Sequence, residues 1–291
     1  VRLDKKLQFI DLANVLSHAN TVLIVNALGA VAQTDMAIVN EAHSRGYIVP
    51  DKRQGEKPLP AAGAYVATPV KGMHKWIGSV DLNSLYPHLI MQYNISPETY
   101  NGITMDTVSV EKMLNKEVKI EGDFATTPNG ARFSKRKQGF LPEVLENLYD
   151  ERVLWKKKMI EHQKEFESTD DPRRKQELNR KIAIAYNNQM VRKISLNSAY
   201  GAIGNEWFRY FELGLAEAVT SSGQLAIKWV ENAVNMYLNN ILGTEDDYVV
   251  AIDTDSIYVR FDELIKSVQP KNPIEFLDQV ASGKMQDVIN N

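Results

Sequence analysis

Two carboxylates lie inside a stretch of sequence that otherwise indicates a buried β-strand. The stretch VVAIDTDSIYV runs from Val249 to Val259 and places Asp253 and Asp255 two residues apart. Removing a carboxylate from water costs several kcal/mol unless a cation or hydrogen-bond donors compensate its charge. Any fold of this chain must therefore bring a compensating partner to this point.

Apolar stretches predict strands that carry these two acids and one more. The sequence KWIGSVDL, residues 75–82, predicts a buried strand that ends at Asp81. The sequences YVVAI and SIYVRF predict a hairpin that has Asp253-Thr254-Asp255 as its turn. Strand ends from two distant parts of the chain are therefore expected to present carboxylates.

The paired carboxylates indicate a site for divalent metal ions. Magnesium takes oxygen ligands and usually binds through one or two carboxylates together with substrate phosphates. Two such ions, about 4 Å apart, can hold the attacking and leaving oxygens of a phosphoryl transfer. We expect Asp81 and Asp255 to bridge two ions, with Asp253 as a nearby helper. The alternative is that the DTDS acids are ordinary turn residues, and this sequence alone leaves both interpretations open.

The residues that follow Asp81 predict an anion site. The sequence DLNSLYPHLI indicates a sharp turn into a helix, where backbone N–H groups of Ser84, Leu85 and Tyr86 could bind a triphosphate. The ring of Tyr86 offers a flat apolar face on which a sugar could lie. For this residue the alternative is a core tyrosine with a satisfied hydroxyl.

Two helical segments predict cations that face the same substrate. In KISLNSAYG, the residues Lys193, Asn197 and Tyr200 fall at i, i+4 and i+7, which places them on one helix face. A cation, an amide and an aromatic ring suit phosphates, a sugar and a stacked base. Arg152 and Lys156 share the i, i+4 spacing on an earlier helix. A solvated helix face is the alternative for both segments.

The segment between the acids predicts two long helices. The first has Pro142 at its opening position and runs to about Phe166, and the second runs from about Arg173 to Tyr200, where Gly201 stops it. The pentapeptide STDDP separates them, so we expect an antiparallel helical hairpin. Further expected elements are helices at 3–18, 33–45 and 215–242, a loop at 51–63, a hairpin at 122–140 that turns at Pro128-Asn129-Gly130, and a helix end at Gly243.

Composition excludes several classes of protein. The 291 residues are 44% hydrophobic, but they contain no run of about 18 apolar residues of the kind that predicts a membrane span. Cysteine is absent, which excludes disulfides and thiolate metal sites. The net charge is −3, so nucleic-acid binding would depend on local basic patches. Because the chain begins with Val1 rather than Met, we expect a piece of a longer protein.

The motifs DLNSLYP, KISLNSAYG and DTDS, in this order and separated by a helical hairpin, resemble those of the family B DNA polymerases. The flanking sequences QYNISPETY and GAIGNEWFRYFEL are similar to those of the replicative polymerases of T-even-type bacteriophages and their cyanophage relatives. The resemblance covers most of the chain and is strongest from about residue 63 to residue 261.

This resemblance implies an α+β fold, with a palm made of an antiparallel sheet and packed helices, and with fingers made of the long helical hairpin. It assigns residues 1–62 to a helical segment at the junction of exonuclease and palm, 63–140 and 202–291 to the palm, and 141–201 to the fingers. The thumb and the exonuclease core would be missing. The acids before position 63 match none of the family's exonuclease acids, so no 3′–5′ exonuclease activity is expected.

The resemblance also implies roles for individual residues. The expected metal ligands are Asp81, Asp255 and the carbonyl of Leu82, with Asp253 as an accessory acid. The triphosphate would be contacted by Ser84, Leu85 and Tyr86, and Tyr86 would also exclude a 2′-hydroxyl. The phosphates would be bound by Arg152, Lys156, Lys193 and Asn197, and the nascent base pair would lie beside Tyr200 and Gly201.

The implied reaction is template-directed attack of a primer 3′-hydroxyl on a deoxynucleoside triphosphate, with release of pyrophosphate. Two Mg²⁺ ions, or Mn²⁺ as a substitute, would be the cofactors. Primer–template DNA and deoxynucleotides would be the partners, together with a sliding clamp that binds a tail of the full protein, and no membrane is expected to take part. The protein would act in the cytoplasm of an infected bacterial host.

Two alternatives to this function remain open. One is a piece that binds nucleotide and DNA only together with a separate thumb chain. The other is a protein-primed member of the family, which would carry insertions between the motifs; the short gaps here disfavour it.

Two positions depart from the family pattern. His88 occupies a position where the family usually has a small serine, and Ala251-Ile252 occupies the position of the usual Tyr-Gly. Neither change removes an expected metal ligand, so we expect the chemistry to survive. A buried histidine with a satisfied ring is the expected state of His88, rather than a catalytic one.

Overall fold

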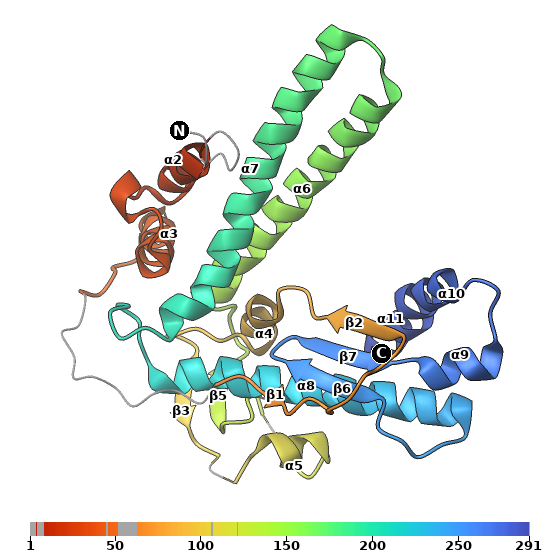
Figure 1. The fold of residues 1–291 in the computed structure, drawn as a ribbon. Coiled ribbons are helices and arrows are strands. Elements are labelled where there is room, and N and C mark those ends of the chain that lie inside the picture. The colour runs from red at the N-terminus through yellow and green to blue at the C-terminus, as the bar shows by residue number, and fades with distance from the viewer. Residues whose placement is uncertain are drawn as a thin grey trace.

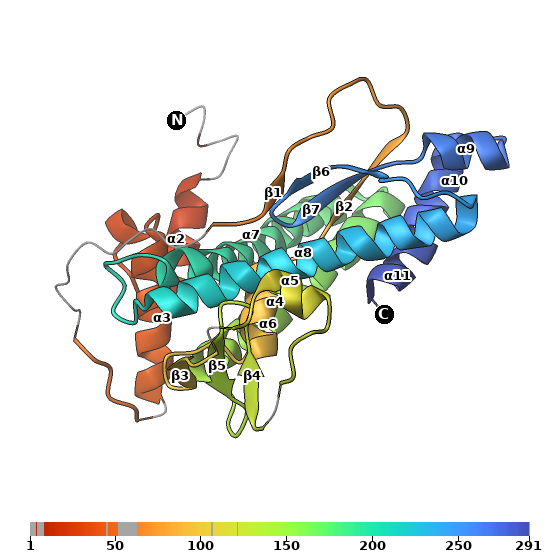
Figure 2. The ribbon, with the colours of Figure 1, turned by 90° about the horizontal axis from the view of Figure 1, so that it is seen from below.

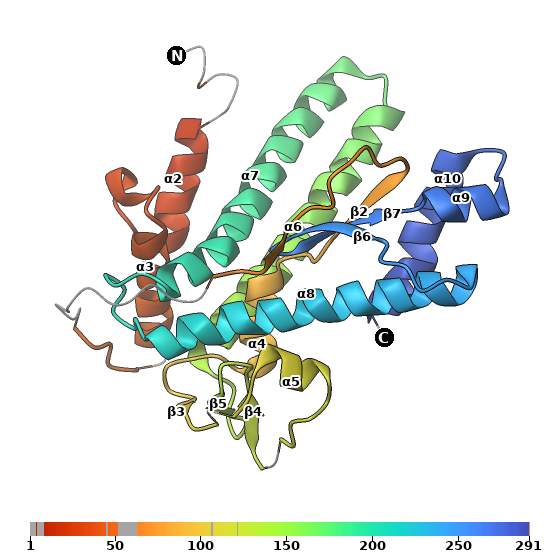
Figure 3. The same ribbon diagram turned by 60° about the horizontal axis from the view of Figure 1, so that its bottom comes forward.

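Two antiparallel sheets lie on opposite sides of one long helix, α8 (Leu213–Leu242), as Figures 2 and 3 show. A helical hairpin projects away from this assembly (Figure 1). The α+β class predicted from the sequence is therefore confirmed. The structure is a computed structural model, and it describes residues 4, 9–44, 46–51, 63–105, 107–120 and 122–290.

The larger sheet has four strands in the order β1-β6-β7-β2, and all neighbouring pairs are antiparallel. Its register brings distant acids together, because Asp81 and Asp253 are both direct Cα partners of Ser256, one from each side. The strands are β1 (Val66–Ala67), β2 (Ile77–Asp81), β6 (Val249–Asp253) and β7 (Ser256–Arg260).

Helix α8 covers one face of this sheet. Ile227, Val230 and Val234 of the helix form one buried cluster with apolar side chains of β6 and β7, including Ile252 and Ile257. Alternation along the strands sends these side chains to the helix and their neighbours to the opposite face. The helix ends at Gly243, as predicted, where a left-handed backbone (φ 68°) lets the N–H bond the carbonyl of Asn239 at 2.8 Å.

One boundary in the larger sheet differs from its prediction. Asp253 belongs to strand β6, and only Thr254 and Asp255 form the turn. The reason is that Asp253 pairs with Ser256, which leaves a two-residue connection with a positive φ of 58° at Thr254.

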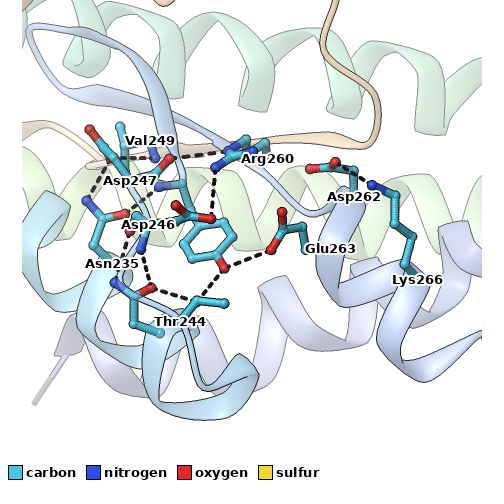
Figure 4. Close-up of polar contacts among 11 residues, drawn as sticks. Asn235, Thr244, Asp246, Asp247, Val249, Arg260, Asp262, Glu263 and Lys266 are labelled. Atoms are coloured by element: carbon cyan, nitrogen blue, oxygen red, sulfur yellow. Dashed lines mark hydrogen bonds and ion pairs between the residues drawn. The ribbon is translucent and has the colours of Figure 1, made fainter.

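A polar network holds the β6–β7 hairpin at the end far from its turn (Figure 4). The side chain of Asn235 on α8 accepts from the Tyr248 N–H at 2.8 Å and donates to the Asp247 carboxylate at 2.9 Å. The Arg260 side chain donates to the Asp247 carbonyl at 3.2 Å, and the Tyr248 hydroxyl donates to Glu263 at 3.3 Å. Because α8 and both strands share these bonds, the register of the hairpin is fixed at its base.

The smaller sheet has three strands in the order β3-β5-β4. The hairpin predicted at 122–140 is confirmed by β4 (Phe124–Thr126) and β5 (Ala131–Ser134), which turn through Pro128-Asn129-Gly130. Strand β3 (Tyr100–Ile103) pairs with β5 and approaches α8, where the hydroxyl of Tyr100 lies over Gly214. A side chain at Gly214 would collide with that hydroxyl.

The predicted helical hairpin is formed by α6 (Phe140–Ser168) and α7 (Pro172–Ile203). Two predicted boundaries are wrong. Pro142 is the third residue of α6 rather than the first, which is tolerated because the first N–H groups of a helix have no acceptor within it. Gly201 does not stop α7, and the helix continues to Ile203 because Ala202 and Ile203 are almost completely buried.

The N-terminal helices pack against α7 through a small cluster that includes Leu16, Ala27 and Val191. The helix predicted at 3–18 is found from residue 9 to residue 20, with residues 5–8 outside the described part, and most of the predicted 51–63 loop also lies outside it. The helix predicted at 33–45 begins three residues earlier. These helices are α2 (Phe9–Asn20), η1 (Ile24–Asn26) and α3 (Ala30–Ser44).

Short helices complete the described part of the chain. None of the described helices is long and apolar enough to cross a membrane. The remaining elements are α4 (Leu85–Tyr93), α5 (Val110–Leu114), α9 (Asp262–Val268), α10 (Pro273–Gln279), η2 (Val280–Met285) and α11 (Gln286–Asn290).

Candidate active site

Asp81 and Asp255 lie on either side of one serine hydroxyl. The Ser256 hydroxyl is 3.2 Å from a carboxylate oxygen of Asp81 and 3.4 Å from one of Asp255. A second contact fixes the strand ends, because the Leu82 N–H donates to the Asp255 carbonyl at 2.8 Å. A hydroxyl carries only one hydrogen, so Ser256 can donate to one carboxylate at a time.

The two carboxylates repel each other. Partial burial is the largest cause that raises the pKa of Asp255, and the nearby charge of Asp81 raises it further. A backbone N–H and the Ser256 hydroxyl lower this pKa and so offset part of the effect, while Asp253 adds a smaller repulsion. Two like charges with so few donors favour the binding of a cation between them.

Asp253 has a different environment from its two neighbours. Its side chain is exposed and accepts a bond from the Thr254 hydroxyl at 3.0 Å. It does not line the cleft described below. Within the described part of the chain, no group of three or more His, Cys, Asp or Glu side chains is placed to hold a metal ion. The acids that meet at the Ser256 hydroxyl are therefore two carboxylates, Asp81 and Asp255, and oxygen ligands of this kind suit a hard cation that takes its other ligands from water or substrate.

An open cleft of about 390 Å³ adjoins these carboxylates. It joins the end of β2, the start of α4, the β6–β7 turn and one face of the α6–α7 hairpin. It is lined by the acids Asp81 and Asp255, the cations Arg152 and Lys193, and by Asn83, Ser84, Leu85, Tyr86, Pro87, Asn197 and Thr254.

The turn into α4 presents backbone donors to this cleft. Ser84 has a left-handed backbone (φ 52°, ψ 45°), and α4 begins at the next residue. The N–H groups of Leu85 and Tyr86 are at the first two helical positions, where no carbonyl of the helix can accept them. On the other side of the turn, Arg152 of α6 donates to the Ser84 hydroxyl at 3.1 Å. Donors and cations from two elements therefore face one space.

The ring of Tyr86 is held between two helices. It contacts the ring of Tyr200 on α7, with centroids 4.4 Å apart. On its other side lies Gly223 of α8, where an added Cβ would come within 2.9 Å of the ring. Burial, followed by Tyr200 and the charge of Asp255, raises the pKa of Tyr86 to about 12. The hydroxyl is therefore protonated at neutral pH.

Besides Asp253, and besides Tyr200 at its border, three residues singled out from the sequence lie outside the cleft lining. Lys156 is exposed one helical turn beyond Arg152, and Gly201 is exposed on α7 with open space around it. The side chain of Leu82 packs against the buried cluster under the larger sheet. The structure brings the remaining predicted residues, except Asp253, to the cleft or to its border.

The sequence arguments missed Ser256, Asn83 and Thr254. Ser256 directly follows the paired acids, and its position opposite Asp81 depends on the strand register. Asn83 and Thr254 lie inside motifs that were already singled out, so their proximity in sequence to the acids was the signal.

Comparison with known proteins identifies similar chains. The family described as "DNA polymerase family B" matches residues 24–269. The DNA-directed DNA polymerase of Escherichia phage RB69 is 30% identical over 335 aligned positions, covering 100% of this chain and 37% of the relative. That of Enterobacteria phage T4 is 30% identical over 332 positions, with 99% and 37% covered. DNA polymerase 1 of Pyrococcus abyssi is 30% identical over 250 positions, with 84% and 28% covered.

One solved structure shares the fold. The family B DNA polymerase from Pyrobaculum calidifontis superimposes with a TM-score of 0.59 at 24% identity, covering 92% of this chain and 32% of that one. The chain thus spans 37% of the length of the two phage relatives.

Proposed function

The chain belongs to DNA polymerase family B, and we propose that it is the catalytic part of a template-directed DNA polymerase encoded by a virus. In this proposal it transfers deoxynucleotides to a primer 3′-hydroxyl with release of pyrophosphate. One observation carries the proposal: a single cleft joins the carboxylates of Asp81, at the end of β2, and Asp255, in the β6–β7 turn, to cations of the helical hairpin. The carboxylates suit a metal ion, and the cations suit a triphosphate.

Asp81 and Asp255 would hold two Mg²⁺ ions, with the carbonyl of Leu82 as a further ligand and Mn²⁺ as a substitute. The ions would polarise the attacking hydroxyl and neutralise charge on the phosphates. The mutual repulsion of the two carboxylates supports this assignment, because a cation relieves it. Asp253, exposed beside them, would act as an accessory charge.

The cleft wall from α4, α6 and α7 would bind the nucleotide. Arg152, Lys193 and Asn197 would contact the phosphates, together with the backbone N–H groups of Leu85 and Tyr86. Ser84 would hold this turn through its bond to Arg152. The neutral Tyr86 ring would lie under the sugar and exclude a 2′-hydroxyl. Three further residues of the hairpin extend this surface: Lys156 toward the phosphates, and Tyr200 and Gly201 toward the nascent base pair.

In the terms used for this family, residues 63–140 and 202–291 would form the palm, 141–201 the fingers and 1–62 the junction to an exonuclease domain. Primer–template DNA would be the partner, read through base pairing to the template and held through its backbone. In the full protein a sliding clamp would be a further partner, and the host cytoplasm the place of action.

Primer extension tests the proposal. The 291-residue chain is mixed with primer–template DNA, deoxynucleotides and Mg²⁺, and extension is compared with that of Asp255→Ala. Loss of a metal ligand should remove several kcal/mol of transition-state stabilisation, which lowers the rate by about a thousand-fold or more. Asp123→Ala is the matched control, because its carboxylate is exposed and does not line the cleft.

Extension that persists in Asp255→Ala would contradict the two-metal assignment. The parent chain could also bind deoxynucleotide in a Mg²⁺-dependent manner but extend no primer. This result would favour the alternative that the chain acts only together with a separate thumb chain. Transfer of a first deoxynucleotide to a protein hydroxyl, without a DNA primer, would favour the protein-primed alternative.

A further inference from the structure

We propose that His88 is a positioning residue that holds the Ser84–Tyr86 turn in place and joins it to helix α6. The inference rests on the proposed function, because this turn is the part of the cleft that would receive the triphosphate. His88 does not line the cleft, and its ring is half-buried behind the turn. Its effect on a nucleotide would therefore pass through the turn.

The ring of His88 bonds the backbone of the turn. Its Nδ1 atom lies 2.9 Å from the Ser84 carbonyl oxygen. A carbonyl can only accept, so Nδ1 must carry a hydrogen and donate it. The backbone N–H of His88 donates to the same oxygen at 3.2 Å. Two donors from one residue therefore fix the direction of this carbonyl.

Fixing that carbonyl also fixes a donor at the cleft. The Ser84 carbonyl and the Leu85 N–H belong to one planar peptide group, in which they point in opposite directions. With the carbonyl held toward His88, the Leu85 N–H must point away from the body of α4, out of its first turn. This is the direction in which an anion at the start of the helix would accept it.

The turn needs such a restraint because its backbone is strained. Ser84 is not glycine, and it has a left-handed conformation with φ 52° and ψ 45°. A non-glycine residue persists in this region only where its surroundings hold it there. Arg152 holds the side chain of Ser84 at 3.1 Å, and His88 holds its carbonyl.

A second contact joins His88 to the helical hairpin. Its ring meets the edge of the Tyr149 ring on α6, with centroids 4.7 Å apart and planes at 81°. Tyr149 and Arg152 are three residues apart and so lie on one face of α6. Helix α6 therefore contacts the turn twice, once through the side chain of Ser84 and once through the ring that bonds its carbonyl.

Two substitutions separate the hydrogen bond from the packing. His88→Phe keeps a ring against Tyr149 but removes the donor. His88→Asn loses the ring but keeps an amide nitrogen at the same number of bonds from Cβ as Nδ1. The matched control is His74→Phe, because the His74 ring also bonds the carbonyl four residues before it, at 2.9 Å from Val70, away from the cleft.

For His88→Phe, we expect the KM for deoxynucleotide in primer extension to rise about tenfold, as for the loss of one well-placed hydrogen bond, with a smaller change in kcat. His88→Asn should stay within about twofold of the parent chain, and so should His74→Phe. An unchanged KM in His88→Phe would overturn the proposal. Equal losses in His88→Phe and His88→Asn would also overturn it, because they would indicate a packing role only.

Hydrogen exchange without nucleotide separates this proposal from the proposed function. Exchange of the segment 83–88 should be faster in His88→Phe and unchanged in His88→Asn. Unchanged exchange in both variants would overturn the role of His88 even if the chain extends primers. A third outcome is that exchange is faster in His88→Phe although the parent chain binds no deoxynucleotide. This outcome would support the role of His88 in fixing the turn and would overturn only the proposed function.

Discussion

The β4–β5 and β6–β7 hairpins both reverse direction through polar residues, but they use their polar atoms differently. In the first, Asn129 accepts from the Thr127 hydroxyl at 2.7 Å and donates to the Gly214 carbonyl at 3.0 Å. In the second, Asp255 faces Asp81 across a single hydroxyl, and burial and repulsion raise its pKa. The first turn satisfies its own polar atoms, whereas the second leaves two carboxylates that share one hydroxyl donor.

This difference distinguishes a turn whose bonds stabilise the fold, the β4–β5 turn, from one that we propose to bind metal, the β6–β7 turn. Thr127 is completely buried and all its bonds lie within the turn. Asp253, Thr254 and Asp255 remain accessible to solvent, as the proposed metal-binding role requires. Four substitutions test whether the β4–β5 turn raises the free energy of unfolding and the β6–β7 turn lowers it.

The largest effect is expected for Gly130→Ala in the structural turn. Gly130 has φ +80°, and an added Cβ would meet the carbonyl oxygen of Met105. Strain and collision together should lower the free energy of unfolding by about 3 kcal/mol, measured by urea denaturation. Gly102→Ala is the control, because Gly102 has φ +82° with nothing within 4 Å. Equal losses at the two glycines would show that the Met105 contact is unimportant.

Asn129→Ala should lower the free energy of unfolding by about 2 kcal/mol, because the Gly214 carbonyl loses its donor and the buried Thr127 hydroxyl keeps only its 3.2 Å contact with the Ala131 carbonyl. Asn129→Asp should lose at least as much, since it keeps the acceptor for the Thr127 hydroxyl but places a second acceptor oxygen against the Gly214 carbonyl. Thermal unfolding followed by circular dichroism measures both. A neutral Asn129→Ala would remove the distinction between the two turns.

A substitution in the β6–β7 turn should change the free energy of unfolding in the opposite direction. Thr254 is β-branched and has φ 58°, a conformation that costs such a residue about 1 kcal/mol or more. Thr254→Gly should therefore raise the free energy of unfolding by about 0.5 kcal/mol, after the greater freedom of glycine in the unfolded chain is included. A lower melting temperature in Thr254→Gly would show that the turn carries no strain.

The smallest effect is expected for Asp255→Asn in the absence of divalent metal. Because the pKa of Asp255 is raised in the folded chain, its charge lowers stability above that pKa, and this loss disappears as the pH falls through it. Removing the charge should raise the free energy of unfolding at pH 7 by a few tenths of a kcal/mol after solvent screening.

Without Mg²⁺, Asp255→Asn should be more stable than the parent chain. Added Mg²⁺ should make the parent chain the more stable of the two, because the ion stabilises only the chain that keeps both carboxylates. Differential scanning calorimetry at pH 7 and at pH 3, with and without Mg²⁺, measures both effects. A gain in Asp255→Asn that persists undiminished at pH 3, below the ordinary pKa of an aspartate, would exclude charge repulsion as its cause.

Much of this arrangement could be predicted from the sequence because local patterns determine it. The apolar runs predicted the strand that ends at Asp81 and the hairpin whose turn carries Asp255, and STDDP predicted the break between the long helices. Gly201 misled the prediction, because the burial of Ala202 and Ile203 outweighs the low helix propensity of one glycine. Tertiary burial of this kind is not visible in a local pattern.

Other features depend on register and packing across the sheet. The position of Ser256 between two carboxylates follows from its pairing with Asp81, which no local signal reports. The unusual pair Ala251-Ile252 also finds an explanation here. Ile252 is 2% exposed and packs in the cluster beneath the sheet with α8, whereas Ala251 pairs with Tyr258 on the opposite face.

The position of α8 between the two sheets determines how freely its sequence can change during evolution. Gly214 accommodates the Tyr100 hydroxyl and Gly223 accommodates the Tyr86 ring, and their spacing places them about half a turn apart around the helix. A larger residue at either position would displace one sheet or the cleft. The second half of α8 exposes Trp229, Met236 and Ile241. We therefore expect sequence drift to accumulate there, while the first half stays nearly fixed on all sides.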